Sequence, residues 1–185
     1  MNLKEEALKL HKLNHGKLAT ASKVKVATKE DLSLVYTPGV AEVCREIAAN
    51  PKTVYDYTFK SNSVAVVTDG SAVLGLGNIG AEASLPVMEG KCVLFKELAN
   101  IDAFPICLAT QNDKEIISIV KNIAPAFGGI NLEDIAAPRC FTIEEALQDI
   151  GIPVMHDDQH GTAIVILAAL INAAKAVNKR IEELK

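Results

Sequence analysis

Two short apolar runs, each followed by a pair of acidic residues, constrain the fold more than any other feature of this sequence. The first run covers residues 128–132 and precedes Glu133 and Asp134; the second covers 152–156 and precedes Asp157 and Asp158. The segment between them has the pattern of a short helix. A strand, a helix and a second strand of these lengths predict a βαβ unit, in which the two strands lie parallel.

The parallel arrangement brings both acidic pairs to the carboxyl edge of the sheet, where open α/β sheets bind their ligands. Neighbouring strands lie ~5 Å apart, so carboxylates from both strand ends can hold one ion. Carboxylates at this separation repel one another unless a cation or a proton lies between them. The pattern therefore favours a Mg²⁺ or Mn²⁺ site with oxygen ligands. The alternative is two solvated pairs of loop carboxylates that bind nothing.

Helical and extended patterns alternate along the rest of the chain. In the βαβ unit, Thr142 and Glu145 form a predicted capping box, and Gly151 ends the helix. Pro38-Gly39 suits the centre of a type II turn. Further helices are predicted at 3–13, 40–49, 84–98, 113–123 and 161–185, and further strands at 62–68, 73–77 and 103–108, the strands 62–68 and 73–77 forming a hairpin.

This alternation predicts an α/β fold with three layers, α/β/α, and a mostly parallel sheet. A helical arm over residues 1–30 precedes it, and we expect residues 1–160, arm included, to form one domain. The 185 residues are 49% hydrophobic with a mean hydropathy of +0.20, which indicates a globular chain.

The charge pattern and the cysteines exclude several classes of partner and site. The net charge is −4 and aromatic residues make up 4%, so we expect no nucleic-acid partner. No secretory signal is evident, and no apolar stretch is long enough to cross a membrane, so a membrane partner is not expected. The cysteines are widely spaced, which is typical of reduced thiols in a cytoplasmic protein.

Residues 75–80 match the G-x-G-x-x-G pattern of dinucleotide-binding loops and follow a predicted strand. The rest of the required context is weak. Pro86 implies that any helix opening at Gly80 is short, and no acidic residue ends a second strand where the ribose-binding acid belongs. The pattern favours a tight glycine turn that lets backbone segments approach closely over a cofactor loop.

Two further residues carry possible chemistry. Tyr36 precedes a Pro-Gly turn and the start of a helix, where its hydroxyl can donate a proton or hold an anion; an ordinary half-buried tyrosine is the alternative. Lys91 lies within an apolar helical run beside Gly90, and such surroundings lower the pKa of a lysine, as a general base requires. A lysine that snorkels from the edge of the core is the alternative.

Taken together, these segments resemble the malic enzymes, in particular the small bacterial type. The resemblance covers nearly the whole chain through five segments in order: 36–40 (YTPGV), 67–80 (VTDGSAVLGLGNIG), 86–91 (PVMEGK), 131–135 (NLEDI) and 156–162 (HDDQHGT). It implies oxidative decarboxylation of malate to pyruvate and CO₂, with NAD⁺ or NADP⁺ and a divalent cation. The larger family members carry an arginine where this chain has Ala72, so recognition of the second substrate carboxylate must differ here.

The resemblance also implies a role for individual residues. Glu133, Asp134 and Asp158 match the family's metal ligands, and Asp157 becomes an adjacent carboxylate outside the ligand set. The metal would chelate the C2 hydroxyl and C1 carboxylate of malate.

Lys91 matches the general base that takes the hydroxyl proton as hydride leaves C2 for the nicotinamide. Decarboxylation of the resulting oxaloacetate leaves an enolate, and Tyr36 matches the general acid that protonates its C3.

In the family a nucleotide-binding domain follows, and we expect the helix at 161–185 to lead into it and the nicotinamide cofactor to bind mainly there. We therefore expect the isolated chain to form no NADH or NADPH from malate. Two alternatives are a nucleotide-independent oxaloacetate decarboxylase and a non-catalytic dimerisation module. Because the arm has a thin apolar face, we also expect a homodimer in which the arm packs on the partner, with Tyr36 serving its own site or the partner's.

Overall fold

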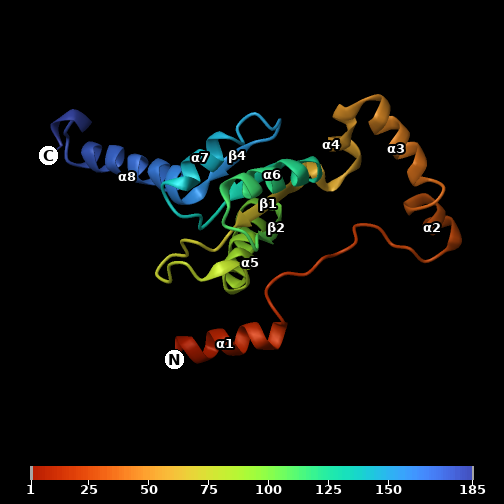
Figure 1. Ribbon diagram of the computed structural model, residues 1–185, viewed down its shortest axis with the longest axis horizontal. Helices are drawn as coiled ribbons and strands as arrows, with labels where there is room; N and C mark the ends of the chain where they lie inside the picture. Colours follow the sequence, from red (N-terminus) through yellow and green to blue (C-terminus); the bar gives the residue numbers. More distant parts are fainter. Residues whose placement is uncertain (1, 185) are drawn as a thin grey trace.

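A four-stranded parallel sheet with the order β2-β1-β3-β4 lies at the centre of the computed structural model, which describes residues 2–184 (Figure 1). The strands are β1 (Ser63–Thr68), β2 (Asp102–Cys107), β3 (Gly129–Leu132) and β4 (Val154–His156). The neighbouring strands of this sheet are all parallel, and the α/β class predicted from the sequence is confirmed.

The alignment of the strand ends is what matters for the site. The β-branched strand β1 lies between β2 and β3, and its Val66 and Val67 are fully buried. Leu132 at the end of β3 pairs with Val67 on one side and His156 on the other. The loops that follow β1, β3 and β4 therefore begin at the same edge of the sheet. Strand β2 lies at the lateral margin, where Pro105 is tolerated.

Helices cover both faces of the sheet and complete the three layers. One face packs against α6 (Asp113–Ile123) and α7 (Arg139–Glu145), and the other against α5 (Gly80–Ala99). The first core contains Ala65, Val67, Ile116, Val120, Ile130, Leu132, Ile143 and Leu147. The second is smaller and contains Val66, Met88 and Cys92.

Helix α5 begins earlier than its sequence pattern predicts. It starts at Gly80 and includes Pro86 in its interior, whereas the sequence predicts a start at Ser84 and only a short helix from the third glycine. The backbone N–H groups of Ile79 and Gly80 both donate to Gly70 O, and this loop contact anchors the earlier start. A Cβ on Gly70 would collide with Gly80 O, so the close approach requires glycine at position 70.

The N-terminal part consists of short helices on a long connection. Helix α1 (Leu3–Asn14) is followed by an irregular stretch, α2 (Lys29–Val35), α3 (Val40–Ala49) and α4 (Val54–Tyr57). Short 3₁₀ turns cover Pro51–Thr53, Phe59–Asn62 and Ala124–Ala126. Figure 1 shows α1 and the α2–α3 segment set apart from the sheet. Apolar side chains therefore remain uncovered there, including Leu3, Leu8, Leu13 and Leu34.

Two local predictions in the first half are wrong. Residues 73–77 form a turn closed by a bridge between Val73 and Gly77 and not a hairpin strand, because the parallel neighbours β2 and β3 already occupy both sides of β1. Gly39 has φ −55° and ψ −40°, which excludes the predicted type II turn, because that turn needs a positive φ there.

Two helix limits in the second half also differ. Helix α7 starts at Arg139 and not at Thr142, so Thr142 does not cap it. The last helix, α8 (Thr162–Ala176), follows a π-helical turn at Asp157–Gly161 and stops well before residue 185. Asn178 has φ +55°, a left-handed conformation that ends the helix, and a 3₁₀ turn follows at Ile181–Glu183.

Helices of the described chain fall short of the combined length and apolarity that crossing a membrane requires.

The core is tested by a matched pair of leucine substitutions. Leu147 is fully buried against the β1 and β3 side chains, whereas Leu98 near the end of α5 is 81% exposed. We expect Leu147→Ala to lower the free energy of unfolding by about 2–5 kcal/mol through lost burial and a cavity. Leu98→Ala should change it by no more than about 0.5 kcal/mol. Urea denaturation followed by circular dichroism measures both, and equal losses would contradict this core.

Candidate metal centre

A cluster of carboxylates lies at the carboxyl edge of the sheet. Glu133 and Asp134 follow β3, Asp158 follows β4, and one oxygen from each lies within 4.8 Å of the others. Glu133 and Asp134 are 6% and 4% exposed, and the Asp158 side chain is 36% exposed. The structure thus brings together the three residues that the family resemblance implies as metal ligands. The cluster opens to solvent on the Asp158 side.

Backbone contacts hold the Asp134 loop in place. Asp134 has φ +55°, a left-handed conformation that aspartate tolerates better than most residues. Its N–H donates to Asp158 Oδ2 at 2.8 Å, and its carbonyl accepts from Ala72 N at 2.9 Å. The loops that follow β1, β3 and β4 therefore meet at Asp134 and fix its backbone.

The carboxylates of this cluster are electrostatically unfavourable neighbours. Burial raises the pKa of Glu133 to about 7, although Asn131 Nδ2 and Lys91 oppose the shift. Burial and the charge of Asp158 raise the pKa of Asp134 to about 6. Asp134 Oδ2 is also buried without a hydrogen-bond partner. A hard cation fits this arrangement. Its positive charge would stabilise the ionised forms of Glu133 and Asp134, and it would accept the unpartnered Asp134 oxygen as a ligand.

Lys91 enters the cluster from α5 and contacts Glu133 Oε1, whereas Asn131 donates to Glu133 Oε2. Its Nζ lies 2.7 Å from Asp157 Oδ2 and 3.1 Å from Glu133 Oε1. The predicted lowering of the Lys91 pKa is wrong for this metal-free arrangement. Burial lowers that pKa, but the carboxylates of Asp157 and Glu133 outweigh burial and raise it. The prediction rested on the apolar neighbours of Lys91 along its helix. The two carboxylates come from the edge of the sheet and are distant in sequence.

Asp157 faces Lys91 and stands outside the three-carboxylate group. A Cβ on Gly161 would collide with Asp157 Oδ1, so the glycine leaves the space that this side chain occupies. The fold thus separates two adjacent aspartates, with Asp158 toward the Asp134 loop and Asp157 toward the lysine.

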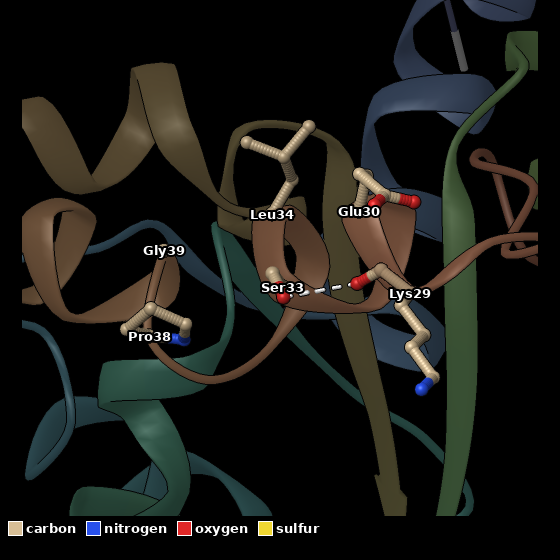
Figure 2. A pocket seen from close by; sticks show the side chains of 6 residues that line it. All are labelled: Lys29, Glu30, Ser33, Leu34, Pro38 and Gly39. Atoms are coloured by element: carbon tan, nitrogen blue, oxygen red, sulfur yellow. Dashed lines mark hydrogen bonds between the residues drawn. The ribbon is translucent and has the colours of Figure 1, made fainter.

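Tyr36 does not join the cluster within one chain. It caps the end of α2 and is 68% exposed, and Figure 1 shows α2 apart from the sheet edge that carries the carboxylates. Beside Tyr36 lies an open hollow of about 430 Å³, shown in Figure 2 and lined by Lys29, Glu30, Ser33, Leu34, Pro38 and Gly39. Glu133, Asp134 and Asp158 do not line it, so it is a surface depression beside α2 rather than part of the site.

Sequence reasoning missed three residues around the cluster. Asn131 is buried in β3 and holds Glu133, and a polar residue at an inward position of an apolar strand is a signal that could have found it. His156 is fully buried with both ring nitrogens unpartnered, and burial lowers its pKa. Arg139 joins several loops through side-chain contacts that no local pattern announces.

Removing one charge from the metal-free cluster should stabilise the chain. At pH 8, which is above the raised pKa of Asp134, this carboxylate is ionised in the folded state, and its burial lowers the free energy of unfolding. We expect Asp134→Asn, measured in a metal chelator, to raise the free energy of unfolding by about 1–2 kcal/mol. Asn also tolerates the left-handed backbone. The exposed Asp149→Asn is the control, and a destabilised Asp134→Asn chain would contradict this account of the cluster.

The chain matches the sequence profile described as the malic enzyme N-terminal domain, over residues 15–118 and 112–148. It is 61% identical over 186 residues to the bifunctional malic/malolactic enzyme of Bacillus subtilis, covering 100% of this chain and 45% of that protein. Against the NAD-dependent malic enzyme of Geobacillus stearothermophilus the identity is 64% over 171 residues, covering 92% and 36%.

Among solved structures, the malic enzyme of Pyrococcus horikoshii superimposes with a TM-score of 0.96 at 57% identity, covering 99% of this chain and 43% of that one. The chain therefore spans less than half the length of these relatives. The profile match covers most of the sequence, including Glu133 and Asp134, and Asp158 lies ten residues beyond its end. This chain belongs to the malic enzyme family and corresponds to the N-terminal domain of its members.

Proposed function

We propose that this chain forms the malate- and metal-binding part of an enzyme that converts malate to pyruvate and CO₂ with NAD⁺ or NADP⁺. The observation that carries the proposal is the convergence of Glu133, Asp134 and Asp158 beside Lys91, with one carboxylate oxygen buried and unpartnered. Membership of the family supports the same reaction.

Glu133, Asp134 and Asp158 would hold the cation. All three offer carboxylate oxygens, which favours Mg²⁺ or Mn²⁺ over softer metals. When bound, the cation would polarise the C2 oxygen of malate and lower the pKa of its hydroxyl. Asn131 keeps Glu133 oriented, and the N–H of Asp134 orients Asp158. These contacts leave the exposed side of Asp158 as the side from which substrate approaches.

Lys91 is the proposed general base. It takes the proton of the C2 hydroxyl while the C2 hydride passes to the nicotinamide, so the alcohol is oxidised and the nicotinamide is reduced. Lys91 must be neutral to accept that proton, yet its carboxylate neighbours favour the charged form. Lys91 Nζ lies 3.1 Å from Glu133 Oε1. A cation bound to Glu133 would therefore compete with protonated Lys91 for this carboxylate. Cation binding thus favours the neutral base.

Tyr36 is the proposed general acid that protonates C3 of the enolate left after CO₂ departs. It lies at the end of α2, just after the arm and away from the cluster, and so requires this segment of another chain or a different position of the segment. We propose a homodimer in which each arm packs on the partner and delivers Tyr36 to the partner's carboxylates. The uncovered apolar side chains of α1 and α2, with Leu3 77% and Leu34 76% exposed, support such an interface.

We also propose that α8 connects this domain, residues 1–160, to the nucleotide-binding part of the protein. Its apolar side chains are largely uncovered, and Ile164, Val165 and Ile166 are each more than half exposed. Figure 1 shows α8 extending away from the sheet. Burying those side chains against another part of the protein would remove apolar surface from water.

Metal titration tests the proposed site. We expect the chain to bind Mn²⁺, and Asp158→Ala to weaken that binding at least 10-fold because it removes a ligand. Asp157→Ala is the matched control: it removes a neighbouring carboxylate that contacts Lys91, and its effect should be much smaller. Isothermal titration calorimetry measures both. The absence of Mn²⁺ binding by the unchanged chain, or equal losses in the two variants, would contradict the assignment.

Complementation tests the shared site in the active enzyme. Tyr36→Phe and Lys91→Ala proteins should each be inactive, because one lacks the acid and the other the base. If sites are shared across a dimer, random mixing should restore about one quarter of wild-type activity, since half the dimers are mixed and each holds one intact site. Subunit exchange is verified with differently tagged chains. No recovery despite exchange would place Tyr36 and Lys91 of one site on the same chain.

A further inference from the structure

Arg139, the first residue of α7, joins several loops through one guanidinium group. Nη1 donates to Asp69 Oδ2 at 2.5 Å and to Ser71 Oγ at 3.2 Å. Nε donates to Asp113 Oδ1 at 2.6 Å, and Nη2 donates to Gln111 O at 2.5 Å. The Asp69 side chain is fully buried, and the Arg139 side chain is 22% exposed. The guanidinium is therefore mostly buried, and each of its three nitrogens donates at least one hydrogen bond.

The partners of Arg139 come from different strands. Asp69 and Ser71 follow β1, and Gln111 lies between β2 and α6. Arg139 itself follows β3 and the loop that contains Asp134. One side chain thus links the loops of three neighbouring strands at the same edge of the sheet, where the carboxylate cluster lies.

The connection continues into the loop that carries the proposed ligands. Ser71 Oγ, which accepts from Arg139, also accepts from Ala136 N at 2.9 Å. The next residue, Ala72, donates its N–H to Asp134 O at 2.9 Å. The β1 loop therefore holds the ligand loop at Asp134 and two residues later. These bonds fix the backbone on both sides of Ile135, which follows the left-handed Asp134.

A second branch reaches the glycine-rich loop. The side-chain amide of Gln111 exchanges two hydrogen bonds with that of Asn78, at 3.0 and 2.9 Å, and also donates to Asp69 O at 3.3 Å. Because Arg139 holds Gln111 by its carbonyl, it restrains residues 69–78 from both ends. The loop that closes one side of the cluster is thereby tied to the start of α7.

We propose that Arg139 is a positioning residue of the metal centre, which holds Asp134 in its ligand geometry through Ser71 and the loop after β1. The inference rests on the proposed metal site and adds a residue that touches neither the metal nor the substrate. Arginine suits the position because its planar fork offers donors in several directions at once, whereas lysine offers a single point charge. Lysine would keep the charge beside Asp69 and lose the fork.

The test compares Arg139→Lys with Arg180→Lys, which alters an exposed arginine paired with Glu183 at the far end of the chain. Circular dichroism first establishes that each variant is folded. We expect Arg139→Lys to weaken Mn²⁺ binding about 10-fold or more, as loss of outer-shell support commonly does, and Arg180→Lys to leave it unchanged. Ser71→Ala should weaken binding in the same direction. The double variant should lose little more than the larger single loss, because both changes act through Ser71 Oγ.

A second readout needs no metal. Amide hydrogen exchange of Ala72 and Ala136 should accelerate at least 10-fold in Arg139→Lys, while the amide of Ile130, which donates to Pro153 O inside the sheet, should not change. Amide exchange tests the effect of Arg139 on the loop separately from the proposed metal site. If the unchanged chain binds no Mn²⁺, the proposed metal site fails, and with it Arg139's role there, whatever the exchange shows about the loop.

Two results would overturn the positioning role while leaving the metal site intact. One is a folded Arg139→Lys chain that binds Mn²⁺ as tightly as the unchanged chain. The other is exchange at Ala72 and Ala136 that is the same in both. If Arg139→Lys does not fold, the same readouts on Ser71→Ala decide the matter, because that substitution cuts the connection between Arg139 and Ala136 directly.

Discussion

The mutual repulsion of Glu133, Asp134 and Asp158 is the constraint on which the rest of the site depends. The fold places oxygens of all three within 4.8 Å of one another and buries two of the side chains. The structure offsets part of this cost with Lys91, with the amide of Asn131 and with the N–H of Asp134. The remainder, marked by the unpartnered Asp134 oxygen, is what would give the cluster affinity for the divalent cation that we propose.

Two basic side chains, Lys91 and Arg139, differ in their surroundings and hence in the roles that we propose for them. Lys91 comes from α5, contacts Glu133 directly and keeps part of its surface exposed, so it can exchange a proton. Arg139 comes from the start of α7, is saturated with acceptors and stays charged, so it can only hold loops in place. The parallel sheet makes the division possible, because its carboxyl edge gathers loops that lie far apart in the sequence.

The domain leaves much of its apolar surface uncovered at both ends. Apolar side chains of α1, α2 and α8 are exposed. Figure 1 shows these three helices extending away from the sheet. Relatives that the chain matches are more than twice as long. The site is correspondingly open, because Asp158 faces solvent and Tyr36 lies away from it. The proposed reaction would therefore require further protein surface to enclose the site.

The sequence by itself determined the βαβ unit, the α3 and α6 helices and the edge at which the carboxylates meet, because hydrophobic periodicity and strand direction are local properties. Only the tertiary structure decided the start of α7 at Arg139, the loop at 73–77 and the raised pKa of Lys91. Each depends on partners that are distant in sequence: Asp69 for Arg139, the strands on both sides of β1, and Asp157 for Lys91. Long-range hydrogen bonds and charges outweighed local propensity at these positions, and no pattern within a short window contains them.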